Sequence, residues 1–84
     1  MKKVIIGIKI PSTFEQVKQI QDIFQAYGNL IKTRLGIHDV EEENVSSYGI
    51  VLLETIGNLD EINTFEAKLK QLPTIQVQGM EFDI

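Results

Sequence analysis

The chain carries the same hydrophobic pattern twice along its 84 residues. In each half, an apolar segment leads into a helical pattern with one apolar stripe, and a second apolar segment follows. Residues 4–10 alternate between aliphatic and other residues, and this period of two is typical of a strand. Pro11 ends the segment because proline has no N–H to give to a sheet ladder. The repeated pattern predicts two consecutive βαβ units, which few folds can accommodate.

Both predicted helices carry start and stop signals. The first begins at a capping box that starts with Ser12, and Gly28 is expected to end it in the left-handed conformation. The second begins at Asn58 in a similar box, and Pro73 prevents its continuation. Each helix has one apolar face, formed by Phe14, Val17, Ile20, Phe24 and Tyr27 in the first and by Leu59, Ile62, Phe65, Leu69 and Leu72 in the second.

The remaining strands differ in how their apolar residues are arranged. Residues 30–38 alternate, whereas residues 48–56 are apolar on both faces, which is typical of a central strand. In residues 75–84 the apolar phase shifts across Gly79, which predicts a β-bulge. Right-handed crossovers place both helices on one face of a four-stranded antiparallel sheet. The prediction is an α+β, ferredoxin-like βαββαβ sandwich that forms a single domain over residues 1–84.

One face of this sheet has no helix to cover it. We expect the first strand to point Val4, Ile6, Ile8 and Ile10 toward the helices. The outer face then carries residues from three strands: Ile5, Gly7 and Lys9 from the first, Ile50, Leu52 and Glu54 from the third, and Lys32, Arg34, Gly36 and His38 from the second. Exposed aliphatic residues with charged surroundings usually mark an interface, and a chain of this length gains stability by association. We therefore predict a homo-oligomer, a dimer or a tetramer, with Ile5, Ile50 and Leu52 in the interface.

Composition argues against several classes of function. With no cysteine, the chain forms no disulfide and no thiolate metal cluster, which fits a cytoplasmic protein. The net charge of −4 and the scattered basic residues argue against direct binding of nucleic acid. No segment approaches the roughly 20 apolar residues of a membrane helix. We expect no cofactor.

The only histidine, His38, precedes an acidic segment, residues 39–47. One imidazole among carboxylates is a poor transition-metal site unless subunits share ligands, so a solvated and mobile loop is expected in place of a metal site. General acid–base catalysis by His38 would need a nucleophile or an orienting partner, and the spacing supplies neither. We therefore assign no catalytic residue.

The only arginine, Arg34, has two interpretations. If the second and third strands form a hairpin centred on residue 44, Arg34 lies across from Glu54, and the two form a cross-strand ion pair. Alternatively, Arg34 and Lys32 bind a carboxylate or phosphate ligand. The ion pair is the preferred interpretation.

The segments 31–39, 49–54 and 79–82 resemble the small proteins known as iron-only hydrogenase system regulators. The similarity extends over nearly the whole chain and is sharpest at Arg34-Leu35-Gly36 and at Gly49. These proteins are similar in shape to ACT domains and to the ligand-binding half of nickel-responsive repressors. The resemblance implies a regulatory or sensing role connected with hydrogenase maturation in anaerobes. Because the chain lacks a DNA-binding segment and the ligands of a nickel site, neither DNA repression nor nickel sensing is expected.

Three hypotheses for function remain open. The preferred one is a non-enzymatic, ACT-like regulatory module, a homo-oligomer that binds a small-molecule effector or a protein partner. Its ligand site is expected at Gly28, Asn29, Arg34 and His38. The second hypothesis is a structural or adaptor homo-oligomer without a ligand. The third is a small enzyme of the ferredoxin-like dimeric-barrel kind, in which His38 serves as acid and base.

Overall fold

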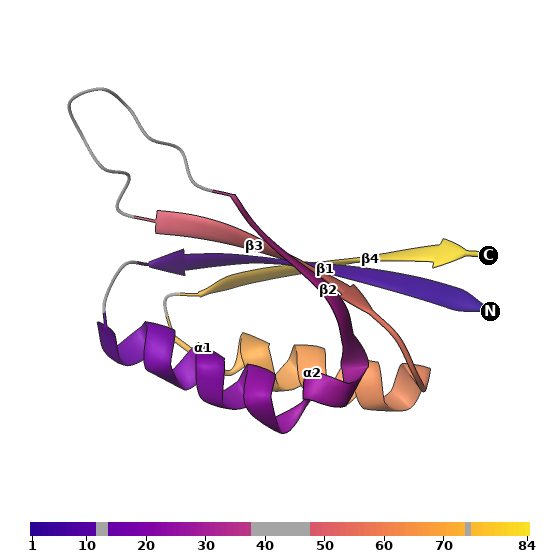
Figure 1. Cartoon of the computed structure of the whole chain (residues 1–84), viewed down its shortest axis with the longest axis horizontal. Coiled ribbons are helices and arrows are strands. Elements are labelled where there is room, and N and C mark those ends of the chain that lie inside the picture. The colour runs from indigo at the N-terminus through magenta and orange to yellow at the C-terminus, as the bar shows by residue number, and fades with distance from the viewer. Residues whose placement is uncertain (12–13, 38–47, 74) are drawn as a thin grey trace.

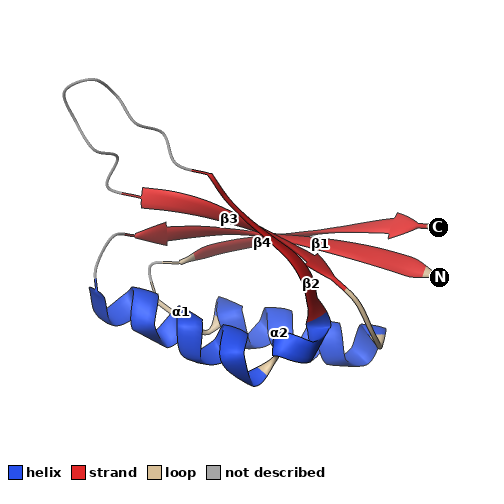
Figure 2. Cartoon of the chain, in the orientation of Figure 1, coloured by secondary structure: helices blue, strands red, loops and turns tan. Residues whose placement is uncertain are grey.

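The computed structural model describes residues 1–11, 14–37, 48–73 and 75–84. Within them, one four-stranded sheet has the strand order β2-β3-β1-β4, and every neighbouring pair is antiparallel. Both helices lie on the same side of the sheet (Figures 1 and 2). The elements are β1 (Lys2–Pro11), α1 (Phe14–Ala26), the 3₁₀ turn η1 (Gly28–Leu30), β2 (Ile31–Ile37), β3 (Tyr48–Thr55), α2 (Leu59–Lys70) and β4 (Gln76–Asp83). This is the predicted ferredoxin-like βαββαβ sandwich, with β1 and β3 in the centre.

The hydrophobic core lies between the sheet and the two helices. The buried apolar residues are Val4, Ile6, Ile8, Ile20, Phe24, Leu30, Leu53, Ile62, Phe65 and Leu69. The ring of Phe65 joins the helices, since its centroid lies 6.3 Å from that of Phe24 and 5.2 Å from that of Tyr27. The hydroxyl of Thr55, also buried, donates to the carbonyl of Val4 at 2.7 Å and ties β3 to β1 inside the core. The predicted inward face of the first strand is therefore correct.

The helix ends follow the sequence signals only in part. The side-chain oxygen of Asn58 accepts a hydrogen bond from the backbone N–H of Asp60 at 2.7 Å, so the predicted cap of α2 is present. The prediction that Gly28 ends α1 in a left-handed conformation is wrong, because Gly28 begins η1. This tighter turn closes when the N–H of Leu30 donates to the carbonyl of Tyr27 at 2.9 Å. The 3₁₀ turn is favoured because it places the Leu30 side chain in the core.

The two faces of strand β2 are reversed relative to the prediction. Ile31 pairs with Thr55 and packs against the core, but the register shifts by one residue before Thr33, which pairs with Glu54. Because side chains alternate along a strand, a shift of one residue sends every later side chain to the opposite face. The face away from the helices therefore holds Thr33, Leu35 and Ile37, and Arg34 and Gly36 lie on the helix side.

Strand β4 has no bulge at Gly79, contrary to the prediction. Its pairing with β1 runs without interruption from Asp83 to Gln76. The apolar phase changes because the two ends of β4 contribute to different faces of the sheet. Val77 packs against the core, whereas Met80 and Phe82 lie on the face away from the helices.

Candidate functional site

The side of the sheet away from the helices is covered by no helix or strand of the described residues (Figure 1). We term this side the open face. Cross-strand partners share a face of a sheet, so the register arranges the side chains in rows across the strands. The rows are Ile37–Ile50–Lys9–Gln76, Leu35–Leu52–Gly7–Gln78 and Thr33–Glu54–Ile5–Met80, followed by the pair Lys3–Phe82.

The open face is rich in apolar residues. They are Leu35, Ile37, Ile50 and Leu52 on β2 and β3, and Ile5, Met80 and Phe82 on β1 and β4. Leu35 is 55% exposed and Phe82 is 50% exposed, so about half of each side chain remains in water. The structure places the three residues of the predicted interface, Ile5, Ile50 and Leu52, on this face. The sequence pattern did not predict the contributions of β2 and β4, because they depend on the register and on which end of β4 faces the core.

Glu54 is the carboxylate at the centre of the open face. The ammonium of Lys3 lies 2.8 Å from its Oε2 atom, and the hydroxyl of Thr33 donates to its Oε1 atom at 2.7 Å. Both partners stabilise the charged form. The hydrogen bond from Lys3, followed by that from Thr33, holds the pKa of Glu54 below its ordinary value. The predicted Arg34–Glu54 ion pair is therefore wrong, because Arg34 lies opposite Leu53 and on the other side of the sheet.

Arg34 instead packs on the first helix. Its guanidinium carbon lies 4.9 Å from the ring centroid of Phe24, which is a cation–π distance. Phe24 lies one helical turn before Gly28, and both Gly28 and Asn29 are exposed in η1. Three of the four residues of the predicted ligand site thus border the edge formed by α1, η1 and β2. The open face lies on the opposite side of the sheet.

Two predictions concern residues outside the described ranges. One is the fourth residue of the predicted ligand site, His38, with its alternative role as an acid and base. The other is the acidic loop 39–47, with its expected mobility. Ser12, which starts the capping box predicted for the first helix, is also outside these ranges.

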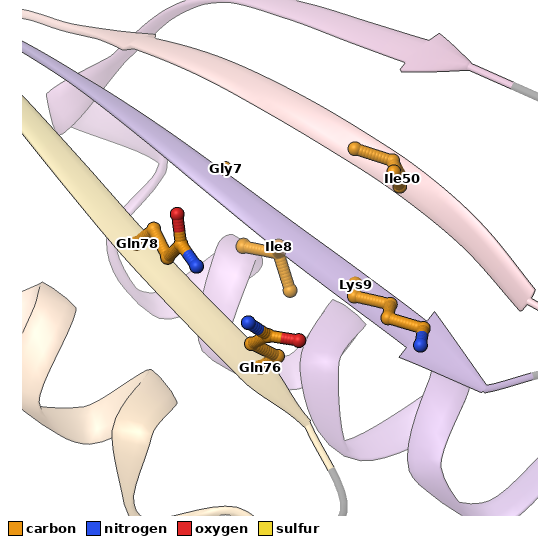
Figure 3. A pocket seen from close by; sticks show the side chains of 6 residues that line it. All are labelled: Gly7, Ile8, Lys9, Ile50, Gln76 and Gln78. Atoms are coloured by element: carbon orange, nitrogen blue, oxygen red, sulfur yellow. The ribbon is translucent and has the colours of Figure 1, made fainter.

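A shallow hollow of about 210 Å³ lies on the open face. Its lining residues are Gly7, Ile8, Lys9, Ile50, Gln76 and Gln78. Figure 3 shows the side chains of Gln76 and Gln78 beside each other along β4, with Lys9 on β1 and Ile50 on β3. The hollow forms where Gly7 contributes no side chain to its row. The hollow could not be predicted from the sequence, because its walls come from three strands.

The backbone at Gly7 does not require glycine. Its φ is not positive, and a Cβ atom added there would lie 3.5 Å from Cδ2 of Leu52, an ordinary van der Waals distance. Glycine inside a strand weakens the strand and often marks a place where a ligand or another backbone approaches closely. The empty space itself is thus the main structural consequence of Gly7.

The sandwich with one covered and one open face defines a small α+β module of the ACT-like kind. An ACT domain from the GTP pyrophosphokinase of Chlorobium tepidum superposes with a TM-score of 0.61 and 16% identity, covering 93% of this chain and 84% of that chain. A formyltetrahydrofolate deformylase from Pseudomonas putida KT2440 superposes with a TM-score of 0.58 and 10% identity, covering 93% of this chain but 28% of that one. These similarities establish the fold.

The profile of the TM1266-like family, described as "Iron-only hydrogenase system regulator, putative", matches residues 2–79. The chain therefore belongs to this family, as its sequence predicted. The structure of the uncharacterized protein TM1266 from Thermotoga maritima superposes with a TM-score of 0.82 at 21% identity, covering 99% of this chain and 100% of that chain. No curated protein matches. None of the helices in the described part of the chain is long and apolar enough to cross a membrane.

Proposed function

We propose that the protein is a non-enzymatic regulatory module of the iron-only hydrogenase system, and that it works as a homodimer joined through the open face. The observation that carries this proposal is the set of apolar side chains that all four strands contribute to that face. Membership of a regulator family and the ACT-like fold support the regulatory role. A small ligand or a protein partner supplies the signal.

The size of the open face suits a dimer. Four strands about 4.8 Å apart, each about eight residues long at about 3.3 Å per residue, give a face of roughly 500 Å² in projection. Because side chains stand out from the sheet, the accessible area exceeds the projection and approaches the roughly 800 Å² that each partner contributes to a standard interface. An area this large and this apolar is rarely left in water.

Sedimentation equilibrium of the wild type and of the Leu52→Glu variant tests the assembly. The wild type should sediment as a dimer and the variant as a monomer. Burying a carboxylate at the centre of an apolar interface costs desolvation free energy, which opposes association. Circular dichroism should be unchanged, since Leu52 faces away from the core. Asn63→Glu adds the same charge on an exposed position of α2 and should remain dimeric. A wild-type chain that stays monomeric at high concentration would refute the proposal.

We place the ligand site of the module at the α1–η1–β2 edge, with Gly28, Asn29 and Arg34 from the described residues and His38 beside them in sequence. The guanidinium of Arg34 suits a carboxylate or a phosphate. Thermal melting with a panel of small carboxylates and phosphates tests this, because a ligand at a hundred times its Kd adds about 2.7 kcal/mol of stability. Arg34→Met should abolish the response. If no compound stabilises the wild type, the dimer is a structural adaptor.

A further inference from the structure

The centre of the open face is a rectangle of four positions on the two central strands, about 4.8 Å across the strands and about 6.6 Å along them. Leu52 and Glu54 lie on β3, opposite Gly7 and Ile5 of β1 respectively. One diagonal of the rectangle therefore joins Leu52 to Ile5, and we term it the apolar diagonal. The other joins Glu54 to Gly7, and we term it the mixed diagonal.

Two copies that pack face to face are related by a two-fold axis lying between the two sheets. The axis can run along the strands, across them, or along either diagonal, and each choice gives Glu54 a different neighbour. An axis along the strands puts Glu54 on the partner's Ile5, and an axis across them puts it on the partner's Leu52. An axis along the mixed diagonal places Glu54 against Glu54 of the partner subunit. The apolar diagonal puts Glu54 on the partner's Gly7.

Charge and hydrophobicity separate the four choices. The first two bury a carboxylate against an aliphatic side chain, which carries a desolvation cost. The mixed diagonal brings two carboxylates together, and like charges across an interface repel. With the axis along the apolar diagonal, Leu52 packs against Leu52 of the partner subunit and Ile5 packs against Ile5 of the partner subunit. The remaining apolar residues lie toward the two ends of this diagonal, with Leu35, Ile37 and Ile50 at one end and Met80 and Phe82 at the other.

We infer that the dimer forms about the apolar diagonal, so that Glu54 of each copy enters the hollow at the partner's Gly7. The diagonal lies about 36° from the strands, so the two sheets then cross at about 70°, which is closer to the orthogonal than to the aligned way of packing sheets face to face. This inference rests on the proposed assembly through the open face, and adds the arrangement of the two copies.

The hollow is lined in part by groups that can donate hydrogen bonds to a carboxylate. It lies beside the ammonium of Lys9 and the amides of Gln76 and Gln78, all of which can donate hydrogen bonds (Figure 3). Lys3 and Thr33 each donate a hydrogen bond to one oxygen of Glu54. Because a carboxylate has about four acceptor sites, Glu54 can accept further hydrogen bonds from the partner. A side chain at position 7 would fill the space, and this gives glycine at that position a function.

Charge complementation between variants tests the arrangement. Leu52→Glu and Leu52→Lys each place like charges on the axis, so each alone should raise the Kd of the dimer about a hundredfold. Mixed together, they should form a heterodimer with a Kd within about tenfold of the wild type, because glutamate then faces lysine. Labelling one variant with ¹⁵N lets native mass spectrometry distinguish the heterodimer from the homodimers. The control mixture is Leu52→Glu with Ile5→Lys, which should not associate.

The hollow is tested separately by filling it. Gly7→Leu should weaken the dimer about tenfold because the new side chain meets the partner's Glu54, and adding Glu54→Ala to the same chain should restore it. Ala67→Leu is the control, since position 67 is exposed on α2, and the helices lie on the side of the sheet opposite the open face.

The outcomes separate this inference from the proposed function. If only the Ile5→Lys mixture rescues Leu52→Glu, the axis follows the mixed diagonal and the inference is overturned, while assembly through the open face stands. Rescue by neither mixture would place the axis along or across the strands and would also overturn it. A monomeric wild type would overturn both. Loss of the circular dichroism signal in Gly7→Leu would be checked with Gly7→Ala, which ordinary contact distances accommodate.

Discussion

Leu35→Ala tests the reversed face of β2, on which the open face depends. Leu35 is 55% exposed, whereas Leu53, on the neighbouring strand, is fully buried. Burying a whole leucine side chain contributes about 1.5–3 kcal/mol, and the monomer buries only about half of Leu35. Leu35→Ala should therefore lower the free energy of unfolding of the monomer by about 1 kcal/mol. The matched variant Leu53→Ala should lower it by about 2–5 kcal/mol, because it leaves a cavity in the core.

Urea denaturation at low protein concentration measures the monomer, and sedimentation equilibrium measures the dimer. In a symmetric dimer the exposed half of Leu35 is buried twice, once in each copy. The loss on association is then about 2 kcal/mol, which corresponds to a Kd about 30-fold higher for Leu35→Ala. If Leu35→Ala destabilised the monomer as much as Leu53→Ala, the side chain would lie in the core, and the face assigned to β2 would be wrong. An unchanged Kd would remove Leu35 from the interface.

The remaining predictions concern two charged groups, Glu54 and Arg34. Lys3→Met should raise the pKa of Glu54 measured by NMR titration, because the hydrogen bond from Lys3 is the main cause that lowers it below 4.5; an unchanged pKa would contradict the ion pair. Since that pKa is lower in the folded chain, the stabilisation is present at neutral pH and lost as the pH falls through the folded value. Arg34→Ala should cost about 0.5–1 kcal/mol in urea denaturation through loss of the contact with Phe24. A double-mutant cycle between Arg34 and Glu54 should show no coupling, and clear coupling would restore the ion pair expected from sequence.

The order of the elements and the class of fold were predictable from local patterns. The alternation in residues 4–10, the apolar stripes of the two helices and the cap at Asn58 each depend on neighbours in the sequence. The structure contains the elements that these patterns predicted, because each pattern concerns hydrogen bonds and burial within one element. The central position of β1 and β3 was also predictable, since right-handed crossovers in a βαββαβ order place the first and third strands in the middle of the sheet. The inward face of β1 followed from its four alternating aliphatic residues, which need burial most.

The faces of β2 and the role of the two ends of β4 were decided only by the tertiary structure. Alternation shows that a strand has an apolar face, but the pairing register decides which side of the sheet that face occupies. At β2, the shift between Ile31 and Thr33 sends Leu35 and Ile37 to the open face, and no local signal marks the shift. At β4, the change of apolar phase to Met80 and Phe82 predicted a bulge, but the pairing with β1 is uninterrupted. The rule that apolar residues point inward failed at both strands because this sheet is apolar on two sides, one packed on its own helices and the other exposed on the open face.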